Sequence, residues 1–294
     1  MPEVQTASRG TEARQRTGAS KQDGGHWIAR LIVIGAAIIT IVPLIWMIFI
    51  SLQKPRVIIS MGWGAEFAVD NFAEIFDPRA VFGGQVINSI LLVISATAIT
   101  LVISALAGYS LSQLQWSNRV VVTVLSVSAL LQVIPPMTLV PGLYATLTNY
   151  GLVNSLTGLI LLNTVFNLPF ATIMTKFYFD TIPGELRESA AIDGASEFGA
   201  FRTVMLPLAA PGIAAVAIFT AIQVWNEFLF GLVFTTGGSQ APITVGIAAL
   251  IQPQEIKFGA MAAVGVVTAV PIILLAIVAN RQIVAGLTGG AVKG

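Results

Sequence analysis

Residues 176–207 read KFYFDTIPGELRESAAIDGASEFGAFRTVMLP, a polar stretch set between two long apolar runs. Pro183 suits the first turn of a helix, and Thr181 or Asp180 can cap that helix. Gly194 then ends it, because glycine readily adopts a left-handed backbone. The stretch therefore predicts a short helix followed by a sharp turn.

A second short helix is expected after this turn, with Ser196 as its cap. Phe198, Phe201 and Met205 recur at spacings of three and four, which places them on one helix face. Pro207 closes the helix in this interpretation. The apolar face needs a cover, which is either the protein's own helices or a soluble partner.

The segments on both sides of this loop are apolar runs, and a bilayer crossing takes about 20 residues at roughly 1.5 Å each. Apolar residues make up 55% of the chain and charged residues only 10%. A soluble domain carries about 25% charged residues, so lipid must be the solvent here. We therefore expect an all-α membrane protein with six transmembrane helices. The runs lie at 31–52, 87–111, 120–144, 152–175, 208–234 and 258–279.

The distribution of Lys and Arg predicts the orientation of this topology. If the N-terminus is cytoplasmic, eleven basic residues lie on the cytoplasmic side and four on the other. This excess indicates that both termini and the loop at 176–207 are cytoplasmic. The four on the other side are Lys54, Arg56, Arg79 and Lys257.

This topology divides the chain into four parts. Residues 1–26 are polar and form a disordered cytoplasmic tail. Residues 27–84 hold the first transmembrane helix and an outer segment. Residues 85–282 form a core of five transmembrane helices with the loop at 181–207. Residues 283–294 form a cytoplasmic C-terminal tail.

The sequence offers little that would support catalysis or a cofactor. It has no cysteine, and its single histidine, His26, lies beside Trp27 at the expected membrane edge. No Gly-x4-Gly-Lys-Ser/Thr run is present to hold nucleotide phosphates, and no His–carboxylate cluster suggests a metal site. No basic patch with interleaved aromatic residues suggests a nucleic acid partner. We expect neither an enzyme nor a resident cofactor or metal.

The loop resembles the EAA loop of importer-type ABC permeases. Its residues ESAAIDG (188–194) are followed, after nine further residues, by VMLP (204–207). The family pattern is Glu-Ala-Ala, three residues, Gly, nine residues and Ile-x-Leu-Pro. Ser189 replaces the first Ala and Val204 replaces the Ile. Both changes leave the helix–turn–helix interpretation intact.

Other short stretches resemble the sugar-importing branch of this family. They are NS at 88–89, AGY at 107–109, YGLVN at 150–154, WNEF at 225–228 and GLTGGAVKG at 286–294. The resemblance implies that residues 85–282 form a permease core in a bacterial or archaeal inner membrane. It also implies four partners: a second permease subunit, two ATPase subunits that carry ATP and Mg, and an extracytoplasmic solute-binding protein.

The resemblance further implies site residues. Glu188 would be the acid that docks on the ATPase, and Gly194 the bend between two coupling helices. The residues expected to couple to the ATPase are Glu188, Ala191, Asp193, Gly194, Phe198 and Phe201. In the sugar branch the segment before the last transmembrane helix faces the binding protein, so Gln252, Gln254 and Glu255 are expected to contact it. The alternative for these three is a plain surface loop.

Sugars are bound through hydrogen bonds and aromatic faces. Gln223, Trp225 and Asn226 in the fifth apolar run are therefore expected to line the substrate path, together with Asn163 in the fourth. The alternative is that such side chains bond one helix to another.

The resulting hypothesis is a permease subunit that moves a sugar by alternating access, powered by separate ATPase subunits. One alternative is a permease for another solute class, such as a polyamine, phosphate or an amino acid. Another is an ion-coupled secondary transporter, which the scarcity of carboxylates in the apolar runs argues against. A third is a membrane scaffold or receptor that moves nothing.

Overall fold

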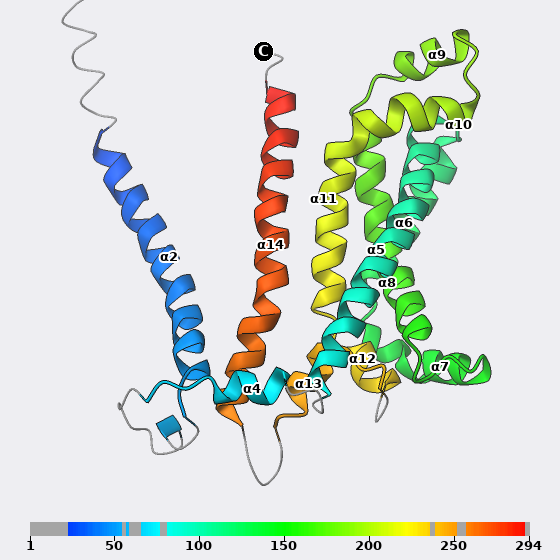
Figure 1. Cartoon of the computed structure of the whole chain (residues 1–294). Coiled ribbons are helices and arrows are strands. Elements are labelled where there is room, and N and C mark those ends of the chain that lie inside the picture. The colour runs from blue at the N-terminus through cyan, green and yellow to red at the C-terminus, as the bar shows by residue number, and fades with distance from the viewer. Residues whose placement is uncertain are drawn as a thin grey trace, which may run out of the picture.

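The computed structural model describes residues 23–54, 57–58, 66–76, 81–235, 239–251 and 257–291. The named elements in these ranges are all helices, and an isolated antiparallel bridge joins Gln53 and Phe67. The predicted all-α fold is thus confirmed (Figure 1). The elements are α2 (Asp23–Ser51), α4 (Asp70–Phe76), α5 (Phe82–Gln113), α6 (Asn118–Val133), α7 (Pro136–Asn149), α8 (Leu156–Asp180), α9 (Gly184–Ile192), α10 (Glu197–Ala200), the π-helix η1 (Phe201–Met205), α11 (Leu206–Trp225), α12 (Leu229–Phe234), α13 (Ile243–Ala248) and α14 (Phe258–Ala291).

Within the described residues, five helices are long and apolar enough to cross a membrane. The pair α6 and α7 makes a sixth crossing if the two helices count as one bent span. The sequence predicted one span over 120–144, but the two helices meet at an angle of 97°. Pro135 and Pro136 cause the break, since neither has an N–H for the helix ladder and Ile134 is pushed to an extended backbone.

The helix after the turn is longer than predicted. Residues Glu197–Trp225 form one continuous helical run through α10, η1 and α11, which bends where it enters the bundle (Figure 1). Pro207 was expected to close the second short helix, and that expectation is wrong. The backbone widens into a π turn just before Pro207, with Leu206 N donating to Phe201 O. This wider turn lets the chain pass the proline without leaving the helix.

The molecule has two distinct ends (Figure 1). At one end lie α9 and α10, together with the start of α2 and the end of α14; we call it the elbow end. At the other lie α4, α7, α12 and α13, and we call it the loop end. α2 begins at Asp23 and α14 continues to Ala291, so helix extends into both predicted tails. The remainder of those tails lies outside the described residues.

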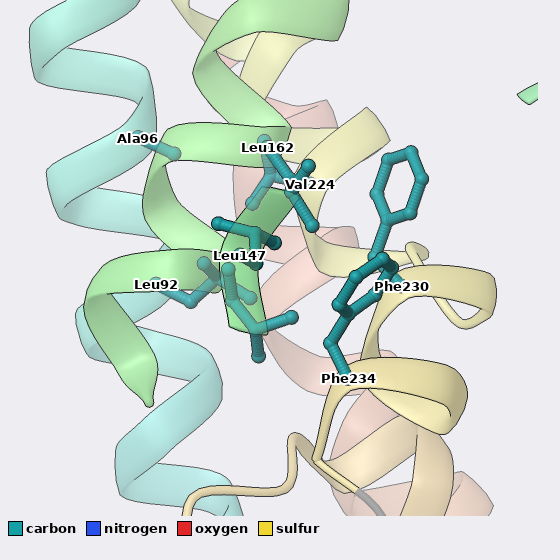
Figure 2. Packing of buried hydrophobic residues seen from close by; sticks show 8 residues of the cluster. Leu92, Ala96, Leu147, Leu162, Val224, Phe230 and Phe234 are labelled. Carbon is teal, nitrogen blue, oxygen red and sulfur yellow. The ribbon is translucent and has the colours of Figure 1, made fainter. Parts of the chain in front are cut away.

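A buried apolar cluster fixes the loop end of the bundle (Figure 2). It joins five helices that are far apart in the sequence, and its side chains interdigitate between them. Close packing of these side chains and rings holds the helices together at this end, because lipid supplies no hydrophobic driving force between helices. The labelled members are Leu92 and Ala96 from α5, Leu147 from α7, Leu162 from α8, Val224 from α11, and Phe230 and Phe234 from α12.

The first membrane helix is attached at its loop-end terminus. Asn71 of α4 is buried, and its Nδ2 donates to Ser51 O at 2.9 Å and to Gln53 O at 2.8 Å. These two carbonyl groups lie at and just beyond the C-terminal end of α2, so the side chain of Asn71 caps that end. Gly259 at the start of α14 packs against the same asparagine, where a Cβ would lie 2.5 Å from Asn71 Oδ1. Above this anchor α2 exposes apolar side chains on all sides, as expected of a helix that faces lipid or another membrane helix.

Candidate functional site

The predicted helix–turn–helix is present and is built by local signals. α9 ends where Gly194 takes a left-handed backbone with φ of +85°. Gly194 N donates to Ala191 O and Ala195 N to Ala190 O, each at 3.0 Å. Ser196 accepts a hydrogen bond from Gly199 N at 3.1 Å and caps α10 as predicted. We call residues 184–200 the elbow.

The expected cap at the start of α9 is wrong. Pro183 occupies the position before the helix, and no side chain caps it. Thr181 instead ends α8, with its hydroxyl donating to Tyr178 O at 2.7 Å. Proline already supplies the fixed φ that starts a helix, so the threonine is free to close the preceding one.

The elbow presents most of the predicted coupling residues on its surface. Glu188, Ala191, Asp193 and Gly194 are exposed, and Phe198 is 63% exposed. The turn also exposes Ile192, with 86% of its surface accessible. An acidic and apolar surface of this kind suits a cleft on another protein that offers cations and apolar side chains.

Phe201 differs from the other predicted coupling residues. It is only 7% exposed, and Met205 is fully buried. The ring of Phe201 lies 5.0 Å from that of Tyr109 and 6.3 Å from that of Phe179, measured between centroids. The apolar stripe is thus divided: Phe198 faces outward, and the other two pack into the protein's own bundle.

A polar node fixes the elbow to the bundle, and the sequence did not reveal it. The carboxylate of Glu197 accepts a hydrogen bond from the Tyr109 hydroxyl of α5. Its second oxygen lies 2.9 Å from Arg187 Nη1 of α9. Beside it, Gln113 Nε2 donates to Phe179 O at 2.9 Å. The AGY stretch contained Tyr109, but nothing in the sequence indicated its partner.

A cavity of about 300 Å³ opens where α6 breaks into α7. It lies among α6, α7, α8, α11 and α12, and we call it the solute pocket. Amides and aromatic rings alternate on its wall, and Glu227 adds one carboxylate. The side chains that line it are Leu131, Gln132, Ile134, Pro136, Asn163, Phe166, Asn167, Phe170, Phe219, Gln223, Glu227, Leu229 and Phe230.

The solute pocket contains only half of the predicted substrate path. Gln223 and Asn163 line it together. Trp225 is buried against α14 and donates from Nε1 to Thr268 O at 3.2 Å. Asn226 caps α11 through Ile222 O at 2.8 Å. These last two border a different cavity of about 250 Å³, between α11, α13 and α14.

The carboxylate of Glu227 is held by backbone donors. Its oxygens accept hydrogen bonds from Phe230 N at 2.6 Å and from Gly231 N at 3.1 Å. Glu227 therefore acts as the capping carboxylate of α12, where the helix dipole also favours a negative charge. This explains how an acid is tolerated in the fifth apolar run.

Two further predictions concern a contact with a binding protein and the absence of a metal site. Gln252, Gln254 and Glu255, expected to contact a binding protein, lie outside the described residues. Among the residues that the structure does describe, no three His, Asp or Glu side chains gather as metal ligands would.

Comparison with known proteins agrees with this geometry. Residues 101–288 match the family of binding-protein-dependent transport system inner membrane components. The chain is 34% identical to the trehalose/maltose transport system permease protein of Thermococcus litoralis, over 90% of this chain and 96% of that one. It is 32% identical to the diacetylchitobiose uptake system permease protein of Streptomyces coelicolor, over 95% and 92% of the two chains.

A solved structure shares the fold. A bacterial ABC transporter that imports the acidic polysaccharide alginate superposes with a TM-score of 0.76 at 18% identity, over 88% of this chain and 97% of that chain. The resemblance inferred from the loop is confirmed, and so is the expectation that the chain is a transport component and not an enzyme. The chain belongs to the family of binding-protein-dependent transport system inner membrane components.

Proposed function

We propose that this chain is the permease subunit of an ABC importer that carries a sugar. The observation that supports this proposal most is the solute pocket, whose wall combines the side chains of Gln132, Asn167 and Gln223 with phenylalanine rings. Sugar hydroxyls require hydrogen-bond partners, and sugar ring faces pack on aromatic rings. Relatives named for disaccharides, at 32–34% identity over nearly the whole chain, support the same substrate class.

The break between α6 and α7 makes this pocket possible. Ile134 and Pro136 flank the break and line the cavity, and the interrupted helix leaves room for a solute between α8 and α11. Irregular backbone at membrane depth is tolerated where it lines a cavity. Transporters commonly place their binding sites at such discontinuous helices.

The elbow is the proposed docking element for the ATPase. Glu188 and Asp193 supply charge, Ile192 and Phe198 supply apolar contact, and Gly194 sets the angle. ATP and Mg belong to two partner ATPase subunits, and no cofactor is proposed for this chain. A second permease and an extracytoplasmic binding protein complete the assembly, the latter in keeping with the family's description.

The elbow end faces the cytoplasm in this proposal. The described basic residues Arg30, Arg119, Lys176, Arg187 and Arg202 belong to that end or to the helix termini that approach it. The opposite end has Lys54 and Lys257. This excess is the one that orients inner-membrane proteins, and it supports cytoplasmic N- and C-termini.

The test is purification and reconstitution. The tagged chain is purified from its native membrane, its partners are identified, and the complex is placed in proteoliposomes with the binding protein. ATP-dependent uptake of trehalose, maltose or a chitooligosaccharide is the expected result. Uptake only of a polyamine, phosphate or amino acid would overturn the sugar assignment. Uptake driven by an ion gradient without ATP would overturn the importer itself.

A further inference from the structure

The helix α5 has a property that the other long spans lack. It runs for 32 residues without a proline, which corresponds to about 48 Å at 1.5 Å per residue. α2, α8, α11 and α14 each contain a proline. Proline removes a ladder hydrogen bond and lets a helix bend. Among the described long spans, α5 is therefore the stiffest.

The elbow-end terminus of α5 holds the elbow. Tyr109 donates its hydroxyl to Glu197 of α10, and Glu197 also pairs with Arg187 of α9. The Tyr109 ring packs on Phe179 and Phe201, with centroid distances of 5.6 and 5.0 Å. Thus α10 is attached to α5 directly, and α9 is attached to it through Glu197.

The loop-end terminus of α5 holds the segment that joins α12 to α13. Asn88 Nδ2 donates to Ser239 O at 2.8 Å and to Ala241 O at 3.1 Å. Ser89 Oγ accepts a hydrogen bond from Ile243 N at 2.9 Å. All three partners lie more than 140 residues away along the chain. Asn88 and Ser89, the NS stretch of the sequence, therefore attach this segment to α5.

A second route joins the two ends, and it is more compliant. α10 continues into α11, which leads on to α12. The helical run from α10 through α11 contains the π turn at Phe201–Met205, Pro207 next to it, and Pro211 within α11. Each feature weakens the ladder of hydrogen bonds, so the covalent route bends where α5 does not.

We propose that α5 is a transmission rod that carries displacement of the elbow to the α12–α13 segment at the opposite end. Tyr109 and Glu197 are positioning residues at one end, and Asn88 and Ser89 are their counterparts at the other. This inference rests on the proposed function, because it assumes that an ATPase moves the elbow. The elbow, α5 and the α12–α13 segment then move as one body while the rest of the bundle rearranges around them.

The experiment measures one distance within this chain in the assembled transporter. The sequence has no cysteine, so two engineered cysteines carry spin labels without background if the partner subunits are also cysteine-free. Ser189→Cys on α9 and Ala249→Cys beside α13 are both exposed sites. The distance between the labels is measured without nucleotide and after trapping with ATP and vanadate. We expect the same distance in both states, because both labels sit on one rigid body.

Removing the attachment of α5 at either end should let the elbow and the α12–α13 segment move independently of each other. In the double variant Tyr109→Phe with Glu197→Gln, the distance should change on trapping, and uptake per ATP hydrolysed should fall. Asn88→Ala should give the same result from the other end. Tyr178→Phe is the matched control: it removes a hydroxyl at the elbow end of α8 that has no partner within the described part of the chain. It should behave as the wild type.

Two results would overturn the rod. One is a label distance that changes on trapping in the otherwise wild-type chain. The other is a double variant whose label distance stays constant and whose uptake remains fully coupled to hydrolysis. Failure of the proposed function is seen separately, because it appears as absence of the ATPase from the purified complex or as uptake of a solute other than a sugar.

Discussion

The contact between α5 and α8 near the elbow predicts a large effect from a small substitution. A Cβ added at Gly108 would lie 2.5 Å from Thr175 Oγ1, 2.7 Å from Lys176 N and 2.9 Å from Thr175 C. Two of these atoms belong to the backbone and cannot rotate away. Gly108→Ala must therefore push the two helices apart at the level where the elbow is attached.

The size of the effect follows from three contributions. Overpacking a tight contact costs about 1–3 kcal/mol. Displacing the Thr175 hydroxyl from Ser104 O, to which it donates at 2.8 Å, costs about 1 kcal/mol more. Alanine returns about 0.5–1 kcal/mol through its higher helix propensity. The free energy of unfolding should fall by about 1–3.5 kcal/mol in total.

Gly142→Ala in α7 is the matched control, because no atom lies within 4 Å of the Cβ it would gain. Thermal unfolding of the purified chain in detergent, followed by tryptophan fluorescence, compares the two variants with the wild type. Gly108→Ala should melt earlier, and Gly142→Ala at the wild-type temperature or above it. If both variants melt at or above the wild-type temperature, the close approach of α5 and α8 is wrong.

Substitutions at four further sites test other parts of the structure. Gly194→Ala should lower uptake and Gly194→Asn should restore most of it, since a left-handed backbone costs most residues about 1–2 kcal/mol and asparagine tolerates it; equal uptake by both would contradict a strained turn. Glu188→Ala should reduce co-purification of the ATPase while membrane insertion, read by protease protection, stays normal. Asn71→Ala should destabilise the chain by about 1–3 kcal/mol, because it leaves the end of α2 uncapped; an unchanged melting temperature would exclude that anchor. Gln223→Ala should raise the sugar concentration needed for half-maximal uptake without changing basal ATP hydrolysis, and an unchanged uptake curve would remove it from the solute pocket.

Features set by neighbouring residues were predictable from the sequence. The elbow needs a left-handed residue at Gly194 and a hydroxyl cap at Ser196, and both signals lie within a few positions of the turn. The node around Glu197 was not predictable, because its partner Tyr109 is 88 positions away. A hydrogen bond over that separation depends on how α5 packs against α10, and helical periodicity contains no information about it.

The effect of proline on the helices was predicted wrongly at two places: one helix was expected to continue and breaks, and another was expected to end and continues. Pro135 and Pro136 stop α6, whereas Pro207 continues a helix that was expected to end. The difference is the backbone that precedes each site. Ile134 is extended before tandem prolines, while the π turn before Pro207 already omits the hydrogen bond that the proline cannot make. A proline in a membrane helix therefore indicates a weak point whose outcome depends on the preceding turn.

The residues predicted to line the substrate path border two different cavities, for a reason that the sequence contained. Successive residues of a helix turn by about 100°, so Gln223 and Trp225 lie about 200° apart and face opposite ways. Phe219, Gln223 and Glu227 recur every four positions, and all three line the solute pocket. Grouping residues 223, 225 and 226 by proximity in the sequence joined side chains from two faces. The face defined by 219, 223 and 227 lines the solute pocket, while Trp225 holds α11 against α14, so substitutions at 223 should alter solute affinity and those at 225 the stability of the bundle.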